Sequence, residues 1–135
     1  MKLLLRNTIH GLIPIYPSDT DEKKKLKLGQ DYEADIKTPR NYQFHKKLFA
    51  LFNLGCQNSK MDLPFDVYRK IMTVRAGFFT AYSTDKGVYY EPDSLSFTAK
   101  DDTQIAEVYS RVMDAIIKDI GGTSEDIEKA LIEFM

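Results

Sequence analysis

TPRNYQFHKKLFALFNLG, residues 38–55, is the stretch that decides the fold, because it holds a whole helix with its start and stop signals. Thr38 is a good N-cap, since its hydroxyl accepts from an amide of the first turn that lacks a helical partner. Pro39 suits the first helical position, where no N–H is needed. Gly55 can adopt the left-handed conformation that ends a helix. The stretch therefore predicts a helix that ends at Gly55.

This predicted helix has a broad apolar face and a basic face. At about 100° per residue, the apolar arc consists of Tyr42, Phe44, Leu48, Phe49, Leu51 and Phe52. The opposite side carries Arg40, Gln43, Lys46 and Lys47. The polar residues Asn41 and His45 are four apart, so they stack on one face, and that face is the apolar one. They form either a buried hydrogen-bonded pair or a site in which His45 is a base, a ligand or a stacking residue.

Length and composition favour one domain, residues 1–135, in a reducing compartment. A chain of 135 residues can bury a substantial core. Its single cysteine, Cys56, excludes an intramolecular disulfide and fits a cytoplasmic location. The apolar start of the chain is too short for a signal peptide, and no apolar run approaches a membrane span. We therefore expect no membrane partner.

The charge is unevenly distributed along the chain, although the net charge is only −1. Lys and Arg outnumber Asp and Glu by 14 to 8 in residues 1–75, and are outnumbered by 5 to 12 in residues 76–135. Such asymmetry is typical of a basic face for an anionic partner, or of two faces that associate in a homodimer. The alternative is that the two halves mix in space and no charged face results.

The remaining patterns predict an α+β fold, in which a small antiparallel sheet, a hairpin plus a meander, packs against about four helices. Strands are predicted at Lys2–Arg6, Leu12–Tyr16, Asp31–Lys37, Phe78–Ser83, Val88–Glu91 and Ser94–Thr98. Besides the helix of residues 38–55, helices are predicted from Ser18 to before Gly29, from Pro64 to Arg75, over Asp102–Ile120 and from Thr123 onward. Asp101 and Gln104 form a predicted capping box for the long helix.

The segment Asp31–Lys37 alternates strictly between acidic and apolar residues. Tyr32, Ala34 and Ile36 alternate with three carboxylates, which is typical of a half-buried strand. Three carboxylates on one face could hold a divalent cation. Without further ligands in the sequence, a solvated strand face is the preferred interpretation.

The predicted meander is rich in aromatic residues: Phe78, Phe79, Tyr82, Tyr89, Tyr90 and Phe97. We expect these rings to pack under the helices as part of the core. The alternative is a row of exposed rings that stacks nucleic-acid bases.

The sequence resembles an uncharacterised phage and prophage family, domain of unknown function 1367, at Arg40–Gly55. Three later stretches, at Pro64–Arg69, Ala76–Phe79 and Ser94–Phe97, match it in the same order. The resemblance implies a phage origin, a cytosolic host setting and no established reaction. A fainter similarity, carried by Arg40, Asn41 and His45, is to NinB-type phage recombination proteins, and it implies action with single-stranded DNA.

Three functions remain open. The first is a phage accessory protein that binds nucleic acid in recombination or replication, through residues Arg40, Asn41, His45, Lys46, Lys47, Arg69, Lys70 and Arg75. The second is a non-enzymatic module that contacts a host or phage protein through its acidic C-terminal part. The third is a metal-dependent nuclease that uses Asp31, Glu33 or Asp35. The glycine spacing fits no phosphate or dinucleotide loop, so we expect no cofactor and lean against an enzyme.

Overall fold

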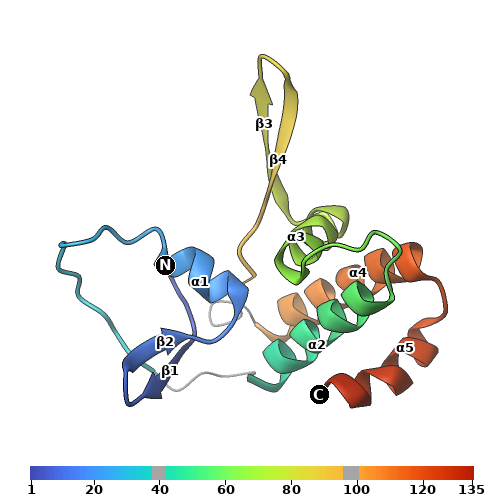
Figure 1. Cartoon of the computed structure of the whole chain (residues 1–135), viewed down its shortest axis with the longest axis horizontal. Helices are drawn as coiled ribbons and strands as arrows, with labels where there is room; N and C mark the ends of the chain where they lie inside the picture. Colours follow the sequence, from blue (N-terminus) through green and yellow to red (C-terminus); the bar gives the residue numbers. More distant parts are fainter. Residues whose placement is uncertain (38–41, 96–100) are drawn as a thin grey trace.

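The computed structural model describes residues 1–37, 42–95 and 101–135, with the side chains of Tyr42 and Asp102 excepted. The elements follow one another as β1 (Leu5–Thr8), β2 (Gly11–Pro14), α1 (Pro17–Lys23), α2 (Tyr42–Asn58), α3 (Phe65–Arg75), β3 (Phe79–Thr84), β4 (Gly87–Pro92), α4 (Asp102–Ile120), α5 (Ser124–Leu131) and the 3₁₀ turn η2 (Ile132–Phe134). The predicted α+β class is confirmed (Figure 1). None of the described helices has the length and apolar character needed to span a bilayer.

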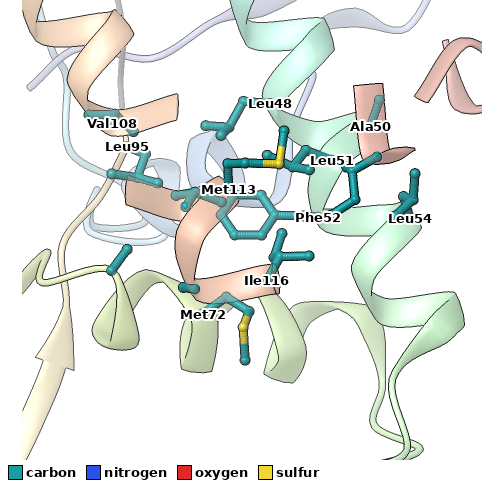
Figure 2. Packing of buried hydrophobic residues seen from close by; sticks show 14 of the residues in the cluster. Leu48, Ala50, Leu51, Phe52, Leu54, Met72, Leu95, Val108, Met113 and Ile116 are labelled. Atoms are coloured by element: carbon teal, nitrogen blue, oxygen red, sulfur yellow. The ribbon is translucent and has the colours of Figure 1, made fainter. Parts of the chain in front are cut away.

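The core lies between α2, α3 and α4, and α5 closes it by packing on α2 and α4. Figure 2 shows Leu48, Leu51 and Phe52 of α2 in one hydrophobic cluster with Met72 of α3 and Ile116 of α4. These side chains are almost fully buried, and burying each contributes roughly 1.5–3 kcal/mol. The apolar stripes that the sequence predicted therefore hold the helices together, although Phe44 at the start of α2 is 38% exposed.

The predicted stop of α2 at Gly55 is wrong, since the helix continues to Asn58. Gly55 lies inside the helix where the hydroxyl of Tyr68 approaches the backbone. A Cβ at this position would lie 2.5 Å from Tyr68 Oη. Close packing of α3 against α2, and not a left-handed turn, explains the glycine. The start signals Thr38 and Pro39 lie outside the described residues.

Three other helices begin close to their predicted starts, and α3 and α4 end at the predicted Arg75 and Ile120. In α4, the Asp101 carboxylate accepts from Gln104 N at 2.8 Å, and Asp101 N donates to Gln104 Oε1 at 3.0 Å, as the capping box predicted. Helix α3 follows Pro64, and α5 follows its cap Thr123. Helix α1 starts one residue before Ser18 and ends at Lys23, well before Gly29.

The strands form two separate two-stranded antiparallel sheets, where one sheet with a hairpin and a meander was predicted. The two hairpins are closed by the same kind of turn, in which a threonine hydroxyl donates to the carbonyl of a glycine three residues later. Thr8 Oγ1 donates to Gly11 O at 2.9 Å, and Thr84 Oγ1 donates to Gly87 O at 2.7 Å. Both glycines have the positive φ that such a turn requires, 108° and 120°.

The third strand of the meander, predicted over Ser94–Thr98, is not formed at Ser94 and Leu95. Leu95 is 2% exposed and belongs to the core cluster. Residues 96–98, including Phe97, lie outside the described residues.

The predicted strand Asp31–Lys37 is wrong. This segment is irregular and every residue in it is exposed, with Tyr32 at 49% and Ile36 at 70%. The alternation of polar and apolar residues was correctly identified, but no described strand lies beside it to pair with its backbone. An alternating pattern becomes a strand only when another strand supplies the hydrogen bonds.

Candidate nucleic-acid interface

The β3–β4 hairpin projects from the helical body, and β4 contacts α3 (Figure 1). Its aromatic side chains are exposed: Phe79 38%, Tyr82 54%, Tyr89 55% and Tyr90 49%. The prediction that these rings pack under the helices is therefore wrong. Among the described rings of this set, Phe78, just before β3, packs partly against the core, and the guanidinium carbon of Arg111 lies 5.5 Å from its centroid.

A groove runs between α3 and β4. Its lining residues come from one side of α3 and from the second strand of the hairpin: Lys70, Ile71, Val74, Arg75, Val88, Tyr89, Tyr90 and Pro92. Ile71 and Val74 are half-buried and form an apolar floor, while Lys70 and Arg75 are exposed at the rim. The groove thus combines apolar and aromatic surface with two cations.

Lys70 and Arg75 are among the residues that the sequence predicted to contact nucleic acid. Neither has an acidic partner among the described residues, and the nearest polar neighbour recorded for Arg75 is Met61 Sδ, at 4.0 Å. Their charges are therefore available to an external anion.

The strand register divides the hairpin into two aromatic faces. Ala81 lies opposite Tyr90, and Tyr82 lies opposite Tyr89. Because neighbouring residues of a strand point to opposite faces, Tyr90 shares one face with Val88 and Pro92. Tyr90 is held there by an edge-to-face contact with Phe79, with the ring centroids 5.1 Å apart. Tyr90 is thus a fixed, half-exposed ring on the strand that lines the groove.

The other face of the hairpin carries Tyr82, Tyr89 and the carboxylate of Glu91. The hydroxyl of Tyr89 donates to Glu91 Oε2 at 2.5 Å. This acceptor raises the pKa of the Tyr89 hydroxyl. A negative charge on this face makes it less suited to a polyanion than the face of Tyr90.

The two lysines predicted on the basic face of α2 have different surroundings. Lys46 is exposed, and no described carboxylate pairs with it. Lys47 is half-buried, lies 3.2 Å from Glu128 Oε2 and sits over the ring of Tyr109 at 4.8 Å. Lys47 therefore joins α2 to α4 and α5. Neither lysine lines the groove, so the structure does not bring α2 and α3 together into one basic site.

Arg69 lies beside Lys70 in the sequence but faces inward. Its side chain is 3% exposed, and Nη2 lies 3.1 Å from Asp21 Oδ2 and 3.5 Å from Asp66 Oδ1. The prediction of a phosphate contact is therefore corrected for Arg69: its charge joins α3 to α1 and does not reach the surface.

His45 is also buried, with 1% of its surface exposed. Its ring is 5.0 Å from that of Tyr16 and 5.9 Å from that of Phe49, measured between centroids. Burial lowers the pKa of His45 to about 4, so the imidazole is neutral at pH 7. His45 links α2 to the segment before α1, and as placed it cannot reach a nucleic-acid base. Arg40 and Asn41 lie outside the described residues.

The nuclease alternative depends on carboxylates that converge on a cation. Asp31, Glu33 and Asp35 are exposed along an irregular segment. Within residues 1–37, 42–95 and 101–135, no three side chains of the types that bind metals gather at one point.

Sequence reasoning did not assign Val88 or Pro92 to a site, and it gave the exposure of Tyr89 and Tyr90 only as the alternative to packing in the core. One signal was present: Tyr89 and Tyr90 are adjacent, and adjacent strand residues face opposite ways. A single layer of helices can cover only one of them. The pair therefore indicated that at least one ring points to solvent.

Comparison with known proteins gives a family but no activity. A family model described as protein of unknown function (DUF1367) matches residues 3–61 and 56–124. No curated protein matches the chain, and no solved structure matches it.

Proposed function

The chain belongs to the DUF1367 family, whose description assigns no function, and from the geometry of the groove we propose that it binds single-stranded nucleic acid. The observation that carries the proposal is the juxtaposition of an exposed aromatic hairpin with two cations, Lys70 and Arg75, which have no acidic partner among the described residues. Proteins that bind single strands combine stacking rings with cations that follow the backbone.

Each part of the groove has a role in this proposal. Lys70 and Arg75 contact successive phosphates, while the ring of Tyr90 stacks on a base. Stacking on an aromatic ring contributes about 1–3 kcal/mol per base and tolerates any sequence. A paired duplex hides the faces of its bases, so the aromatic hairpin favours a single strand. In the cell, the protein is a phage-encoded accessory factor that acts in the host cytoplasm on single-stranded DNA during recombination or replication.

Fluorescence anisotropy of labelled single- and double-stranded oligonucleotides across a salt series tests this proposal. Wild type should prefer the single strand, with an affinity that falls linearly in a log–log plot. The double variant Lys70→Gln with Arg75→Gln should reduce the slope by about 1.4, since each neutralised phosphate of a single strand contributes about 0.7. Lys118→Gln, on the exposed side of α4, is the matched charge control and should leave the slope unchanged.

Two tyrosines of one hairpin provide a matched test of stacking. Tyr90→Ala should weaken single-strand binding by about tenfold or more. Tyr82→Ala removes an equally exposed ring from the other face and should have little effect. Equal losses in both variants, or no binding by wild type at low salt, would refute the proposed site. Lys46→Gln in the same assay measures whether α2 contributes.

A further inference from the structure

The segment Asp31–Ile36 is irregular and exposed, and no described strand pairs with it. The hydroxyl of Tyr32 accepts a hydrogen bond from Lys27 N at 3.0 Å. Tyr32 is 49% exposed and Ile36 is 70% exposed. Within the described part of the chain, the recorded ion pair of this segment joins Lys37 Nζ to Asp35 Oδ2 at 3.3 Å. It carries three carboxylates, at Asp31, Glu33 and Asp35, and no basic residue between them.

The groove between α3 and β4 has the complementary properties. Its floor, Ile71 and Val74, matches an apolar face such as that of Tyr32 and Ile36. Its rim carries Lys70 and Arg75, whose long side chains reach over the edge toward charges on the outer side of a bound strand. A strand that places its apolar residues against Ile71 and Val74 and its carboxylates toward Lys70 and Arg75 therefore complements the groove in both shape and charge.

The main chains are complementary too. Strand β4 pairs with β3 along one edge, and no described strand pairs with its other edge. No backbone hydrogen bond is recorded for residues 31–37 within the described part of the chain. Unpaired strand edges readily accept an extended segment as an additional strand.

In this structure the segment does not lie in its own chain's groove. Figure 1 shows the stretch after α1 looping out on the opposite side of α1 from the β3–β4 hairpin. Helix α1, which precedes the segment, is held to α3 by the buried pair of Arg69 and Asp21. If the segment that fills the groove comes from a second molecule, the contact between α1 and α3 stays intact.

We infer that, when nucleic acid is absent, the segment Asp31–Ile36 of a second copy occupies the groove between α3 and β4, and the two copies exchange segments reciprocally. The acidic strand takes the place of a phosphate backbone, so it competes with nucleic acid. Its regulatory role rests on the proposed function, whereas the contact between the two copies does not.

Charge reversal on each half of the contact tests the exchange. The groove variant combines Lys70→Glu with Arg75→Glu, and the segment variant combines Asp31→Lys, Glu33→Lys and Asp35→Lys. All five residues are exposed, so both variants should fold. In sedimentation equilibrium without nucleic acid, wild type should dimerise at micromolar concentration, and each variant alone should be weakened by about tenfold or more.

An equimolar mixture of the two variants provides the decisive measurement. In the mixed pair both grooves meet a segment of opposite charge, so the heterodimer should regain the wild-type affinity. A wild-type protein that stays monomeric, or a mixture that fails to recover, would overturn the inference. The inference would also be overturned if the segment filled the groove of its own chain. In that case the segment variant would bind the oligonucleotide faster than wild type, and both would have the mass of a monomer.

The regulatory role has a separate readout. The isosteric variant with Asp31→Asn, Glu33→Gln and Asp35→Asn adds no positive charge. It should bind a labelled single strand several-fold more tightly than wild type at a protein concentration where wild type is dimeric. If the protein dimerises but does not bind the oligonucleotide, the proposed function is refuted and the exchange of segments still holds. If it binds the oligonucleotide but stays monomeric at every concentration, the exchange is refuted and the proposed function still holds.

Discussion

Arg69 and Asp21 join α3 to α1 through a charge that is almost removed from water. Nη2 of Arg69 lies 3.1 Å from Oδ2 of Asp21, and the Arg69 side chain is 3% exposed while that of Asp21 is 33% exposed. Asp66 gives a second, longer contact at 3.5 Å. The N-terminal hairpin and α1 are therefore attached to the helical core by a buried ion pair as well as by aromatic packing.

Removing Asp21 should cost more than removing a surface charge. Asp21→Ala leaves the buried guanidinium with Asp66 alone, and we expect a loss of about 1–3 kcal/mol in the free energy of unfolding. Glu125→Ala breaks the exposed pair with Lys129 and is the control, with an expected change within about 0.5 kcal/mol. Urea unfolding followed by circular dichroism measures both, and equal values would contradict the role of this ion pair.

Gly55→Ala should destabilise the protein, although alanine is the better helix former by about 1 kcal/mol. The new methyl group would lie 2.5 Å from Tyr68 Oη and 3.1 Å from Ile116 Cγ2, and Tyr68 is fully buried. We expect a net loss of about 1–3 kcal/mol from overpacking.

Tyr68→Phe tests the cause of that loss. This change removes the hydroxyl that would clash, together with its hydrogen bond to Asp119 Oδ2 at 2.9 Å. In a double-mutant cycle, Gly55→Ala should therefore cost less in the Tyr68→Phe background than in wild type. An equal cost in both backgrounds would show that the hydroxyl does not set the glycine requirement.

Stability should fall as the pH is lowered from about 6.5 to about 4, because of His45. The folded state keeps the imidazole neutral, with its pKa lowered to about 4 by burial. The unfolded chain takes up a proton near pH 6.5, so protons favour unfolding within this window, by up to about 3 kcal/mol at its acid end. Below about pH 4 both states are protonated, and this contribution becomes constant.

His45→Phe isolates that contribution. The variant should lose less stability than wild type between pH 6.5 and pH 4, when unfolding free energies are measured in urea at each pH. His10 is the other histidine and is exposed, so His10→Ala should leave the wild-type profile unchanged. Parallel profiles for wild type and His45→Phe would contradict a neutral, buried imidazole.

The β3–β4 hairpin should contribute little to global stability. The core cluster contains no residue of Phe79–Pro92. Phe79 and Pro92 are paired across the base of the hairpin, so a Gly-Gly link between them can replace residues 80–91. We expect this shortened chain to unfold with a free energy within about 1 kcal/mol of wild type, since isolated hairpins are marginal. A loss of several kcal/mol would show that the hairpin is part of the core.

The sequence predicted helices better than strands, for a physical reason. The signals of α4 are local: the capping box at Asp101 and Gln104 and the apolar stripe up to Ile120 lie within one segment. The alternation in Asp31–Lys37 is equally clear, but a strand also requires a neighbour that its own sequence does not specify. Gly55 was wrongly interpreted as a stop signal, because the glycine is required by the close approach of Tyr68, which belongs to another helix.

The candidate site was predicted in part for the same reason. Lys70 and Arg75 were identified by charge alone. Arg69 precedes Lys70 directly, but its burial depends on Asp21, which is 48 residues away in the sequence. The groove depends on how α3 meets β4, and Tyr90 lines it because β4 contacts α3 while leaving this ring half-exposed.

The position of the hairpin outside the core has an evolutionary consequence. Changes in the core are constrained by packing, so most of them reduce the amount of folded protein before they alter its activity. Residues of the hairpin are largely free of this constraint, since their side chains contact few buried groups. The sequence of the hairpin can therefore change while the helical body is retained.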